Sequence, residues 1–349
     1  MEDLHKRFSE RYPQSFFLDV SRPNELEGYL RALNWIRPED SIQKLEKPGE
    51  GNMNCVYRVK TTKGSFIVKQ ARPWVEKYPQ IPAPVNRAGV EATFLGIVNE
   101  TLPLQSLSPQ LLGFDPNSFF LALEDLGAGT DYTFLYQRNG LLESTEIEQL
   151  TRYLDVLHAF STQQNIAFPH NKDMRVLNHE HIFRFPFEEQ NGFDLDTLQP
   201  GLQAASLPYK RAKDLKEKVN LLGEVYLSTG KTLLHGDFYP GSWLKVDQGI
   251  RIIDPEFSFL GPAEFDLAIF FAHMMLAQQG QEQLITIAQA YPRFGQLNAR
   301  LLAGFAGTEI LRRLIGIAQL PLEIEIDEKK ELMQVAANWI LEGKISEIA

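Results

Sequence analysis

The sequence has little cysteine, no excess of positive charge and no long apolar run, and each shortage excludes a class of protein. Cys55 is the single cysteine, which excludes an internal disulfide and a cysteine-rich zinc site. The net charge of −10 argues against nucleic acid and anionic membranes as main partners, because both attract clustered lysine and arginine. Nucleotide binding stays open, since one phosphate chain needs only a few local cations or a metal.

Two further absences concern membranes and secretion. The longest apolar stretch, LAIFFAHMMLA, is interrupted by His273 and is too short to cross a bilayer. The first residues, MEDLHKRFSERYPQ, are charged and lack the apolar region of a secretory signal. We therefore expect a cytoplasmic protein in a reducing compartment, with no membrane partner.

The length of 349 residues favours two lobes over one core. Strand-rich runs dominate the first part: CVYRV and SFIVK read as a hairpin, and SPQLLGFD and SFFLALEDLG as two more strands, with helices over residues 24–36 and 90–100. Residues 72–89 are rich in proline and predict a long, mobile loop. Helical spacing dominates after residue 141, over 143–164, 204–228, 263–278, 281–291, 296–318 and 327–345. This pattern predicts an α+β chain with a β-rich lobe over residues 1–125 and a helical lobe over 126–349.

Three carboxylates stand among apolar residues in LLHGDFYPGSWLKVDQGIRIIDPEF, residues 233–257. They are Asp237, Asp254 and Glu256. VDQG predicts a turn between two short strands, and such a hairpin would bring Asp237 and Asp254 together. Close carboxylates repel unless a cation lies beside them, and Mg²⁺ is the usual one at phosphate sites. One carboxylate can then accept a proton while the others hold the metal.

Upstream residues complete a set that is typical of phosphoryl transfer. A turn at Gly51 precedes a strand that ends with Lys69, and Glu91 in the next helix could pair with that lysine. A turn over phosphates, a lysine, a glutamate, a catalytic aspartate and a metal-binding aspartate follow one another in kinase order. The alternatives are a turn role for Asp237, an edge-strand role for Lys69 and a structural salt bridge for Glu256.

These motifs resemble those of the aminoglycoside phosphotransferase and choline kinase superfamily, and in detail those of methylthioribose kinases. The motifs are EGNMNCVYRV, FIVKQARP, EDLG, HGDFYPGSW, IDPEFSFLGPAEFD and LRRLIGIA, from about residue 50 to residue 318. The resemblance implies a two-lobed protein-kinase-like fold, ATP and Mg²⁺ as cofactors, and a small hydroxyl-bearing acceptor. It also suggests a homodimer.

The resemblance further implies a role for each matching residue. Asp237 would be the base, Asp266 would brace its loop, and His235 would order that loop. Six residues would serve nucleotide binding, at the turn over the phosphates, at the α/β-phosphates or beside the adenine at the lobe connector. They are Gly51, Asn52, Lys69, Glu91, Glu124 and Leu126. The metal ligands would be Asp254, Glu256 and Ser242. Arg312 and Arg313 match paired arginines that serve the sugar and the transfer.

The sequence departs from the family pattern beside the proposed base. Ser242 stands where most of the superfamily has a metal-binding asparagine, although methylthioribose kinases also tend to have serine there. Tyr239 and Pro240 replace the histidine and threonine of that subfamily, so a ketosamine, an aminoglycoside or an amino alcohol stays open as the acceptor. A catalytically silent nucleotide-binding protein is the other alternative. For Arg312 and Arg313, which fall outside the apolar sector of their helix, the alternative is a solvated face.

Overall fold

The chain divides into two units, one of which takes in a short segment from the other's part of the sequence. The computed structural model describes residues 4–49, 51, 53–164 and 166–348, and its N-terminal unit comprises Met1–Ala128 with Asp254–Phe257. The C-terminal unit comprises Gly129–Ile253 and Ser258–Ala349. The sequence predicted a boundary after residue 125 and did not assign the DPEF segment to the first unit.

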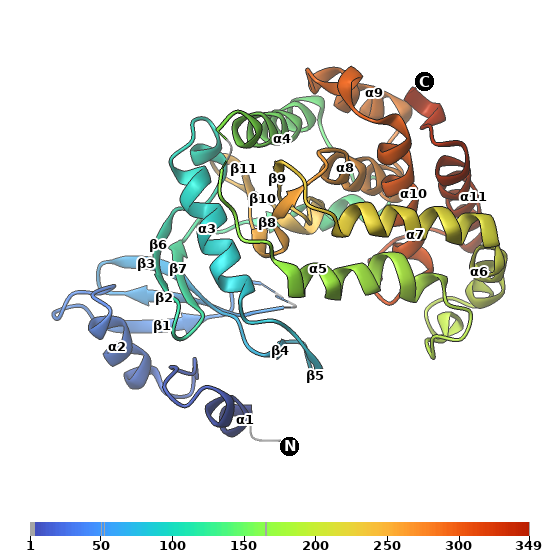
Figure 1. Cartoon of the computed structure of the whole chain (residues 1–349). Helices are drawn as coiled ribbons and strands as arrows, with labels where there is room; N and C mark the ends of the chain where they lie inside the picture. Colours follow the sequence, from blue (N-terminus) through green and yellow to red (C-terminus); the bar gives the residue numbers. More distant parts are fainter. Residues whose placement is uncertain (1–3, 50, 52, 165, 349) are drawn as a thin grey trace. The chain divides into compact units, whose positions relative to one another are not determined.

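An antiparallel sheet forms the centre of the N-terminal unit (Figure 1). In order across the sheet, its strands are β1 (Ile42–Glu46), β2 (Cys55–Thr61), β3 (Gly64–Gln70), β7 (Phe120–Glu124) and β6 (Leu111–Asp115). The predicted hairpin is confirmed as β2 and β3, which pair from Cys55↔Gln70 to Thr61↔Gly64. Val59 and Val68 share a buried cluster with Leu26 and Leu30 of helix α2 (Pro23–Ala32), so alternation along each strand places one face on the core.

The proline-rich segment is not an irregular loop, and that prediction was wrong over residues 74–82. Strand β4 (Trp74–Val75) pairs with β5 (Tyr78–Pro82). Trp74 is fully buried, and the Arg7 guanidinium from helix α1 (Leu4–Arg11) lies 4.9 Å from its ring centroid. Prolines are tolerated in so short a pair because edge positions need no N–H donor. The sequence pattern did not indicate that the large aromatic side chain of Trp74 would be buried and would stabilise this pair of strands.

Helix α3 (Arg87–Asn99) contacts β6 and β7 of the sheet and the turn at Pro255–Phe257. Its apolar residues are buried nearly all round, as Val90, Phe94, Leu95 and Val98 illustrate. The helix therefore joins the sheet to the DPEF segment inside the N-terminal unit.

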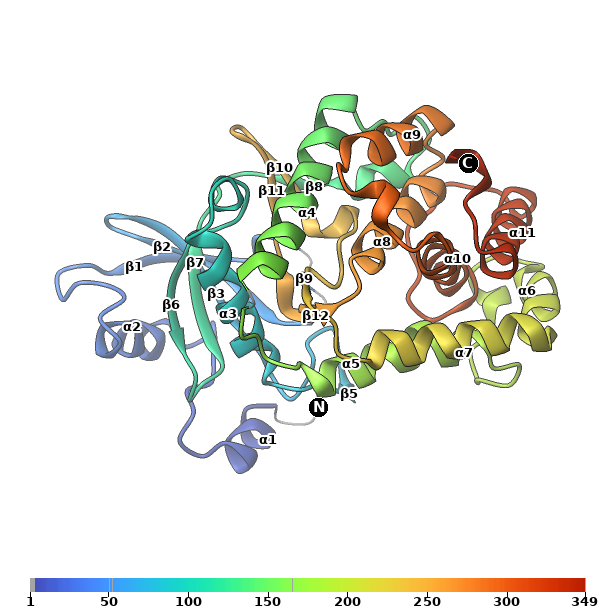
Figure 2. The same cartoon turned by 45° about the horizontal axis from the view of Figure 1, so that its top comes forward.

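Helices dominate the C-terminal unit (Figures 1 and 2). They are α4 (Ser144–Gln164), α5 (Lys172–His179), α6 (Leu202–Arg211), α7 (Lys213–Leu227), α8 (Glu264–Leu276), α9 (Gln281–Ala290), α10 (Ala299–Ile315) and α11 (Ile326–Glu342). Helix α10 packs against both α8 and α11, α5 lies along α7, and α4 lies beside α9. Helix α8 is mostly apolar and is almost wholly buried, as a central helix requires.

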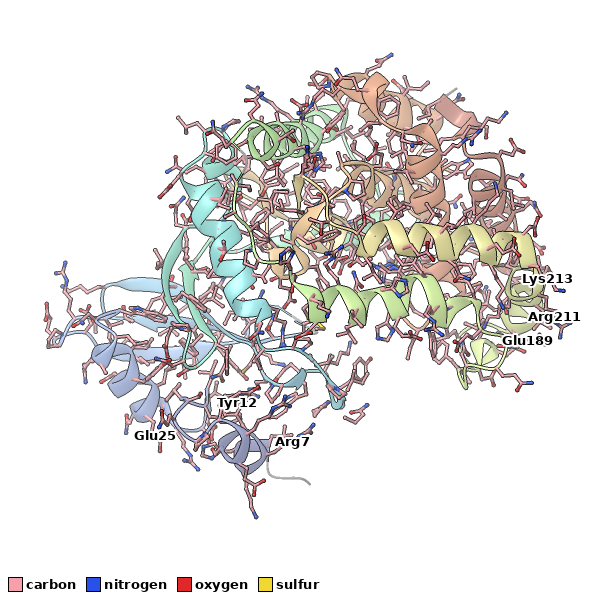
Figure 3. All side chains as sticks on the ribbon, viewed as in Figure 1. Arg7, Tyr12, Glu25, Glu189, Arg211 and Lys213 are labelled. Atoms are coloured by element: carbon pink, nitrogen blue, oxygen red, sulfur yellow. The ribbon has the colours of Figure 1, made fainter. Side chains whose placement is uncertain are left out.

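The stretch 204–228, predicted as helical throughout, is broken into two helices. Helices α6 and α7 meet at Ala212, whose ψ of 108° is extended. Pro208 in α6 has no N–H and interrupts the hydrogen-bond ladder of that helix. Arg211, the last residue of α6, forms an ion pair with Glu189 (Figure 3).

Short strands frame the loops that carry the predicted acidic residues. The hairpin around VDQG is confirmed as β10 (Trp243–Val246) and β11 (Gly249–Ile252), with β8 (Thr130–Asp131) beside β10. Strand β9 (Thr232–Leu234) pairs with β12 (Phe259–Gly261). The loop of Asp237 therefore leaves β9 and leads into β10 within the C-terminal unit.

Candidate active site

Lys69 lies at the centre of the polar cluster in the N-terminal unit. Its Nζ is 2.7 Å from a carboxylate oxygen of Glu91 and 2.6 Å from Oδ1 of Asp254. Strand β3 presents the lysine, α3 presents Glu91, and the DPEF segment presents Asp254. The edge-strand alternative is excluded by burial, because the Lys69 side chain is only 3 % exposed. The structure thus brings together three of the residues that the sequence singled out.

Burial and charge act in opposite directions on this cluster. Burial disfavours the charge of Lys69, but Asp254, Glu91 and Glu256 outweigh it and raise the lysine pKa above its ordinary value. Burial raises the pKa of Glu91 to about 7, although Lys69 opposes that shift. The ammonium group of Lys69 therefore stays charged at neutral pH.

Asp254 is held in a conformation that exposes its carboxylate. Its φ of 60° lies in the left-handed region, which aspartate tolerates better than most residues. Its side chain is 51 % exposed, against 2 % for Glu91. Of the two acids that contact Lys69, only Asp254 can also be reached by a ligand from solvent.

Glu256 contacts two side chains that sequence reasoning did not single out. Its Oε2 accepts a hydrogen bond of 2.8 Å from Nδ2 of Asn54 and lies 3.1 Å from Nε of Arg87. Arg87 begins α3, four residues before Glu91, so the helical spacing places both on one face. That spacing was the signal available for Arg87; its pairing with Glu256 depends on the tertiary fold.

The other residues predicted for nucleotide binding lie outside this cluster or outside the described chain. Gly51 is exposed and donates its N–H to the carbonyl of Gly49, whereas Asn52 lies outside the described residues. Glu124 ends β7, and its carboxylate accepts the N–H of Gln110. Leu126 is half-buried. In the described part of the chain, the hydrogen bonds and ion pairs of Lys69 go to Glu91 and Asp254 and not to Gly51, Glu124 or Leu126.

A buried aspartate in the C-terminal unit holds the loop of Asp237 in place through hydrogen bonds to its backbone. Asp266 is fully buried and accepts the N–H groups of His235 and Gly236 at 2.7 and 2.9 Å. Gly236 has a φ of 83°, a region that favours glycine. Nε2 of His235 lies 3.0 Å from the carbonyl oxygen of Ile253. These contacts are the bracing that the resemblance implied for Asp266 and His235.

Arg312 and Arg313 are not on a solvated face, and that alternative is excluded. They are 5 % and 7 % exposed, and both donate from Nε to Glu309, one helical turn earlier on α10. A guanidinium nitrogen of Arg313 lies 3.9 Å from Oδ1 of Asp237. Burial opposes the charge of Glu309, but the two arginines outweigh it and hold its pKa well below the ordinary value.

Glu309 also connects the arginines to a buried histidine. It lies 3.0 Å from Nε2 of His273, whose Nδ1 is 2.6 Å from the hydroxyl of Tyr136. Because Glu309 is ionised, Nε2 of a neutral His273 carries the proton and Nδ1 accepts from Tyr136. Sequence reasoning missed Glu309 and Tyr136, although Glu309 stands at helical spacing from both arginines.

The residues that depart from the family pattern pack into the same cluster. The Arg313 guanidinium lies 5.0 Å from the ring centroid of Tyr239, and the Tyr239 and His273 rings are 5.2 Å apart. A Cβ at Gly241 would come within 2.7 Å of the Tyr239 ring, so a larger residue there would displace that ring. Pro240 begins a single helical turn that ends at Ser242, which is buried. The Tyr239 ring therefore occupies space next to Arg313.

Comparison with known proteins decides the family. A family model described as "Phosphotransferase enzyme family" matches residues 44–302, well over half of the chain. The chain belongs to the phosphotransferase enzyme family. A methylthioribose kinase of Bacillus velezensis is 27 % identical over 84 % of this chain and 85 % of its own length. One of Geobacillus sp. is 28 % identical over 85 % of this chain and 84 % of its own length.

A solved structure supports the fold. A spectinomycin phosphotransferase in complex with ADP and spectinomycin aligns with a TM-score of 0.51 and 15 % identity, over 93 % of this chain and 96 % of that one. The fold is the protein-kinase-like one, with a β-rich N-terminal lobe and a larger helical C-terminal lobe. As a phosphotransferase, the protein is a small-molecule kinase with an alcohol group as acceptor.

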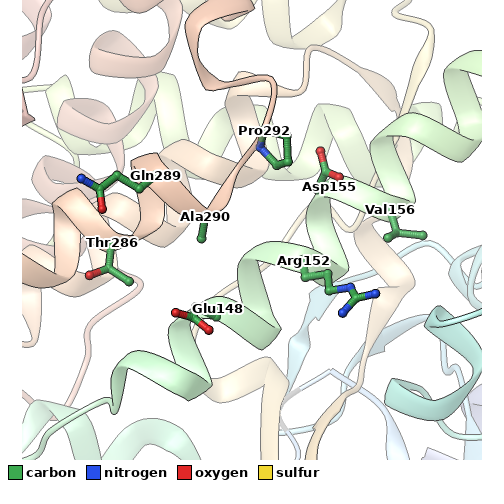
Figure 4. Close-up of a pocket in the computed structure, with 8 residues that line it drawn as sticks. All are labelled: Glu148, Arg152, Asp155, Val156, Thr286, Gln289, Ala290 and Pro292. Atoms are coloured by element: carbon green, nitrogen blue, oxygen red, sulfur yellow. The ribbon is translucent and has the colours of Figure 1, made fainter.

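Two further observations concern the rest of the described chain. No described helix is long and apolar enough to span a bilayer. A groove of about 610 Å³ lies between α4 and α9 (Figure 4), and none of the predicted site residues lines it. Its lining residues are Glu148, Arg152, Asp155, Val156, Thr286, Gln289, Ala290 and Pro292.

Proposed function

We propose that this phosphotransferase transfers the γ-phosphate of ATP to the anomeric hydroxyl of methylthioribose, with Mg²⁺. The observation that carries the nucleotide side is the contact of Lys69 with both Glu91 and Asp254. A lysine fixed by a buried glutamate is the device by which kinases bind the α/β-phosphates. The acceptor rests on the two methylthioribose kinases, which match over most of both chains.

The residues of the N-terminal unit would bind the nucleotide. The ammonium of Lys69 would contact the phosphates, Gly51 and Asn52 would form the turn over them, and Glu124 and Leu126 would lie near the adenine. Asp254 fits a metal ligand, because its carboxylate is exposed and Mg²⁺ commonly uses one or two carboxylates plus water and phosphate. Ser242 and Glu256 are the further ligands that the sequence suggests. When bound, Mg²⁺ would neutralise charge on the β- and γ-oxygens.

The residues of the C-terminal unit would serve the acceptor. Asp237 would orient the hydroxyl and accept its proton. Asp266 would keep the Asp237 loop in place, and Arg312 and Arg313 would stabilise charge that develops on the transferred group. A buried guanidinium suits this task because it stays protonated and binds phosphate oxygens in pairs.

Tyr239 and Pro240 favour a second candidate with the same mechanism and a different acceptor. The Tyr239 ring lies against Arg313 and fills space beside the proposed base. An acceptor of another shape, such as a ketosamine, an aminoglycoside or an amino alcohol, would then be phosphorylated. A catalytically silent ATP-binding protein is the third candidate.

A cytoplasmic location agrees with the buried, unpaired thiol of Cys55, and the homodimer stays a prediction.

The test is ATP consumption by the purified protein with Mg²⁺ and one acceptor at a time. We expect turnover stimulated by methylthioribose. Stimulation only by another sugar, an aminoglycoside or an amino alcohol would keep the mechanism and replace the acceptor. If Tyr239 sets that choice, Tyr239→His would shift the preference towards methylthioribose. ATP binding without stimulation by any acceptor would support the silent protein.

A further inference from the structure

Glu256 occupies a different environment from Asp254, although both belong to the DPEF segment. Glu256 is 4 % exposed, and its Oε2 receives the amide of Asn54 at 2.8 Å and lies 3.1 Å from Nε of Arg87. Nε of Arg87 also donates to Oδ1 of Asn54 at 2.9 Å. The three side chains therefore form a closed triangle in which each contacts the other two.

Arg87 extends this triangle to the backbone on both sides. Its terminal nitrogens donate to the carbonyl oxygens of Met53 at 3.0 Å, Arg72 at 3.0 Å and Pro84 at 2.6 Å. The arginine is fully buried and belongs to the first turn of α3. It thus joins the end of the predicted phosphate turn, at residues 53–54, to α3 and to Glu256.

A metal on Glu256 would conflict with this arrangement. An ion bound to its carboxylate would lie close to the guanidinium of Arg87, and two cations in a buried site repel strongly. Moving Arg87 away would leave its charge buried without a carboxylate, which is costlier still. Asp254 also pairs with a cation, since Lys69 lies 2.6 Å away, but its carboxylate is half exposed, so water can screen an ion bound there.

We propose that Glu256 is a positioning residue rather than a metal ligand: through Arg87 and Asn54 it fixes residues 53–54, at the end of the predicted turn over the ATP phosphates. This inference rests on the proposed function. Asp254 is then the carboxylate of the DPEF segment that contacts Mg²⁺. The role also explains why the chain buries a glutamate two residues after an exposed aspartate.

The test measures nucleotide and metal binding separately in the full chain. ADP affinity is measured by calorimetry in EDTA, and Mn²⁺ affinity by electron paramagnetic resonance at saturating ADP. Glu256→Gln and Asn54→Ala should each weaken metal-free ADP binding by about tenfold, since the first removes the negative charge that pairs with buried Arg87 and the second removes the amide that joins Glu256 to Arg87. The double variant should lose little more than either single variant, because both act on one contact. Asp254→Asn should instead weaken Mn²⁺ binding.

The controls separate this role from loss of folding. Glu27→Gln, which removes an ion pair with Arg31 on α2, should change neither affinity. Thermal melting shows that each variant is folded, and Asn54→Ala keeps the test open if Glu256→Gln is not. The proposal is overturned if Glu256→Gln weakens Mn²⁺ binding as much as Asp254→Asn while metal-free ADP binding stays unchanged. If the wild type binds no ADP, the proposed function falls and this inference with it.

Discussion

Asp237 combines a cation within reach with partial exposure to solvent. A guanidinium nitrogen of Arg313 lies 3.9 Å from its Oδ1. The Asp237 side chain is 23 % exposed. A general base must reach the acceptor hydroxyl and exchange a proton, so partial exposure suits that role.

Asp237→Asn should therefore remove turnover and spare nucleotide binding. We expect kcat to fall by about 10² to 10⁴, the usual contribution of a positioned base, with little change in ADP affinity. Steady-state kinetics and calorimetry would measure the two effects. Asp247→Asn, an exposed change in the turn between β10 and β11, is the matched control. Retained phosphorylation in Asp237→Asn would show that another group takes the proton.

The residues that sequence reasoning found and missed differ in what identifies them. Lys69, Glu91 and Asp254 were found because a known chemistry requires them in that order along the chain. Arg87 was missed because its partners, the DPEF segment and the loop at residues 53–54, become neighbours only in the fold. Glu309 was within reach, since a carboxylate three and four residues before two arginines predicts ion pairs on a helix.

At the level of elements, α10 gathers its site residues by helical spacing alone. The helix begins at Asn298, whose side chain accepts the N–H groups of Arg300 and Leu301. Glu309 then faces the Nε atoms of Arg312 and Arg313 from one turn earlier. All three side chains are buried among α8, α10 and their neighbours. The position of both guanidinium groups therefore depends on one carboxylate.

Glu309→Gln should destabilise the C-terminal unit strongly. Removing the carboxylate leaves two buried guanidinium groups without their partner, and breaking a buried ion pair in this way costs about 3–5 kcal/mol. Urea unfolding followed by circular dichroism would measure the loss in free energy of unfolding. Glu331→Gln, on the exposed side of α11, is the control and should change it little. Equal stability of the two variants would mean that water reaches and solvates the arginines.

The elements predicted correctly are those with a local signal. The hairpins β2–β3 and β10–β11 have turn residues between two strand-like runs, which is enough to predict them. The pair β4–β5 lacks such a signal, since prolines surround it and burial of Trp74 stabilises it. The break between α6 and α7 follows a proline whose effect the helical spacing of apolar residues concealed.

At the level of the whole molecule, the chain leaves the C-terminal unit at Ile253 and returns to it at Ser258. The DPEF segment is thereby part of the unit that contains Lys69, while the strands on either side of it belong to the other unit. The sequence predicted that the hairpin would bring Asp237 and Asp254 together. Those residues belong to different units, so this stays a prediction.

His273 makes the stability of the C-terminal unit depend on pH. Burial lowers the pKa of His273 to about 4. The contact with Glu309 opposes this shift, and Arg312 and Arg313 add to it. The unfolded chain binds a proton near the ordinary value of 6.5, whereas the folded chain does so only near 4, so stability is full above pH 6.5 and falls as the pH decreases towards 4. The loss of stability is about 3 kcal/mol over that interval.

Urea unfolding at several pH values would measure this loss of stability. His273→Gln should flatten this dependence, while His170→Gln, an exposed control, should leave it unchanged. The same slope in His273→Gln as in the wild type would mean that other groups cause the acid loss of stability.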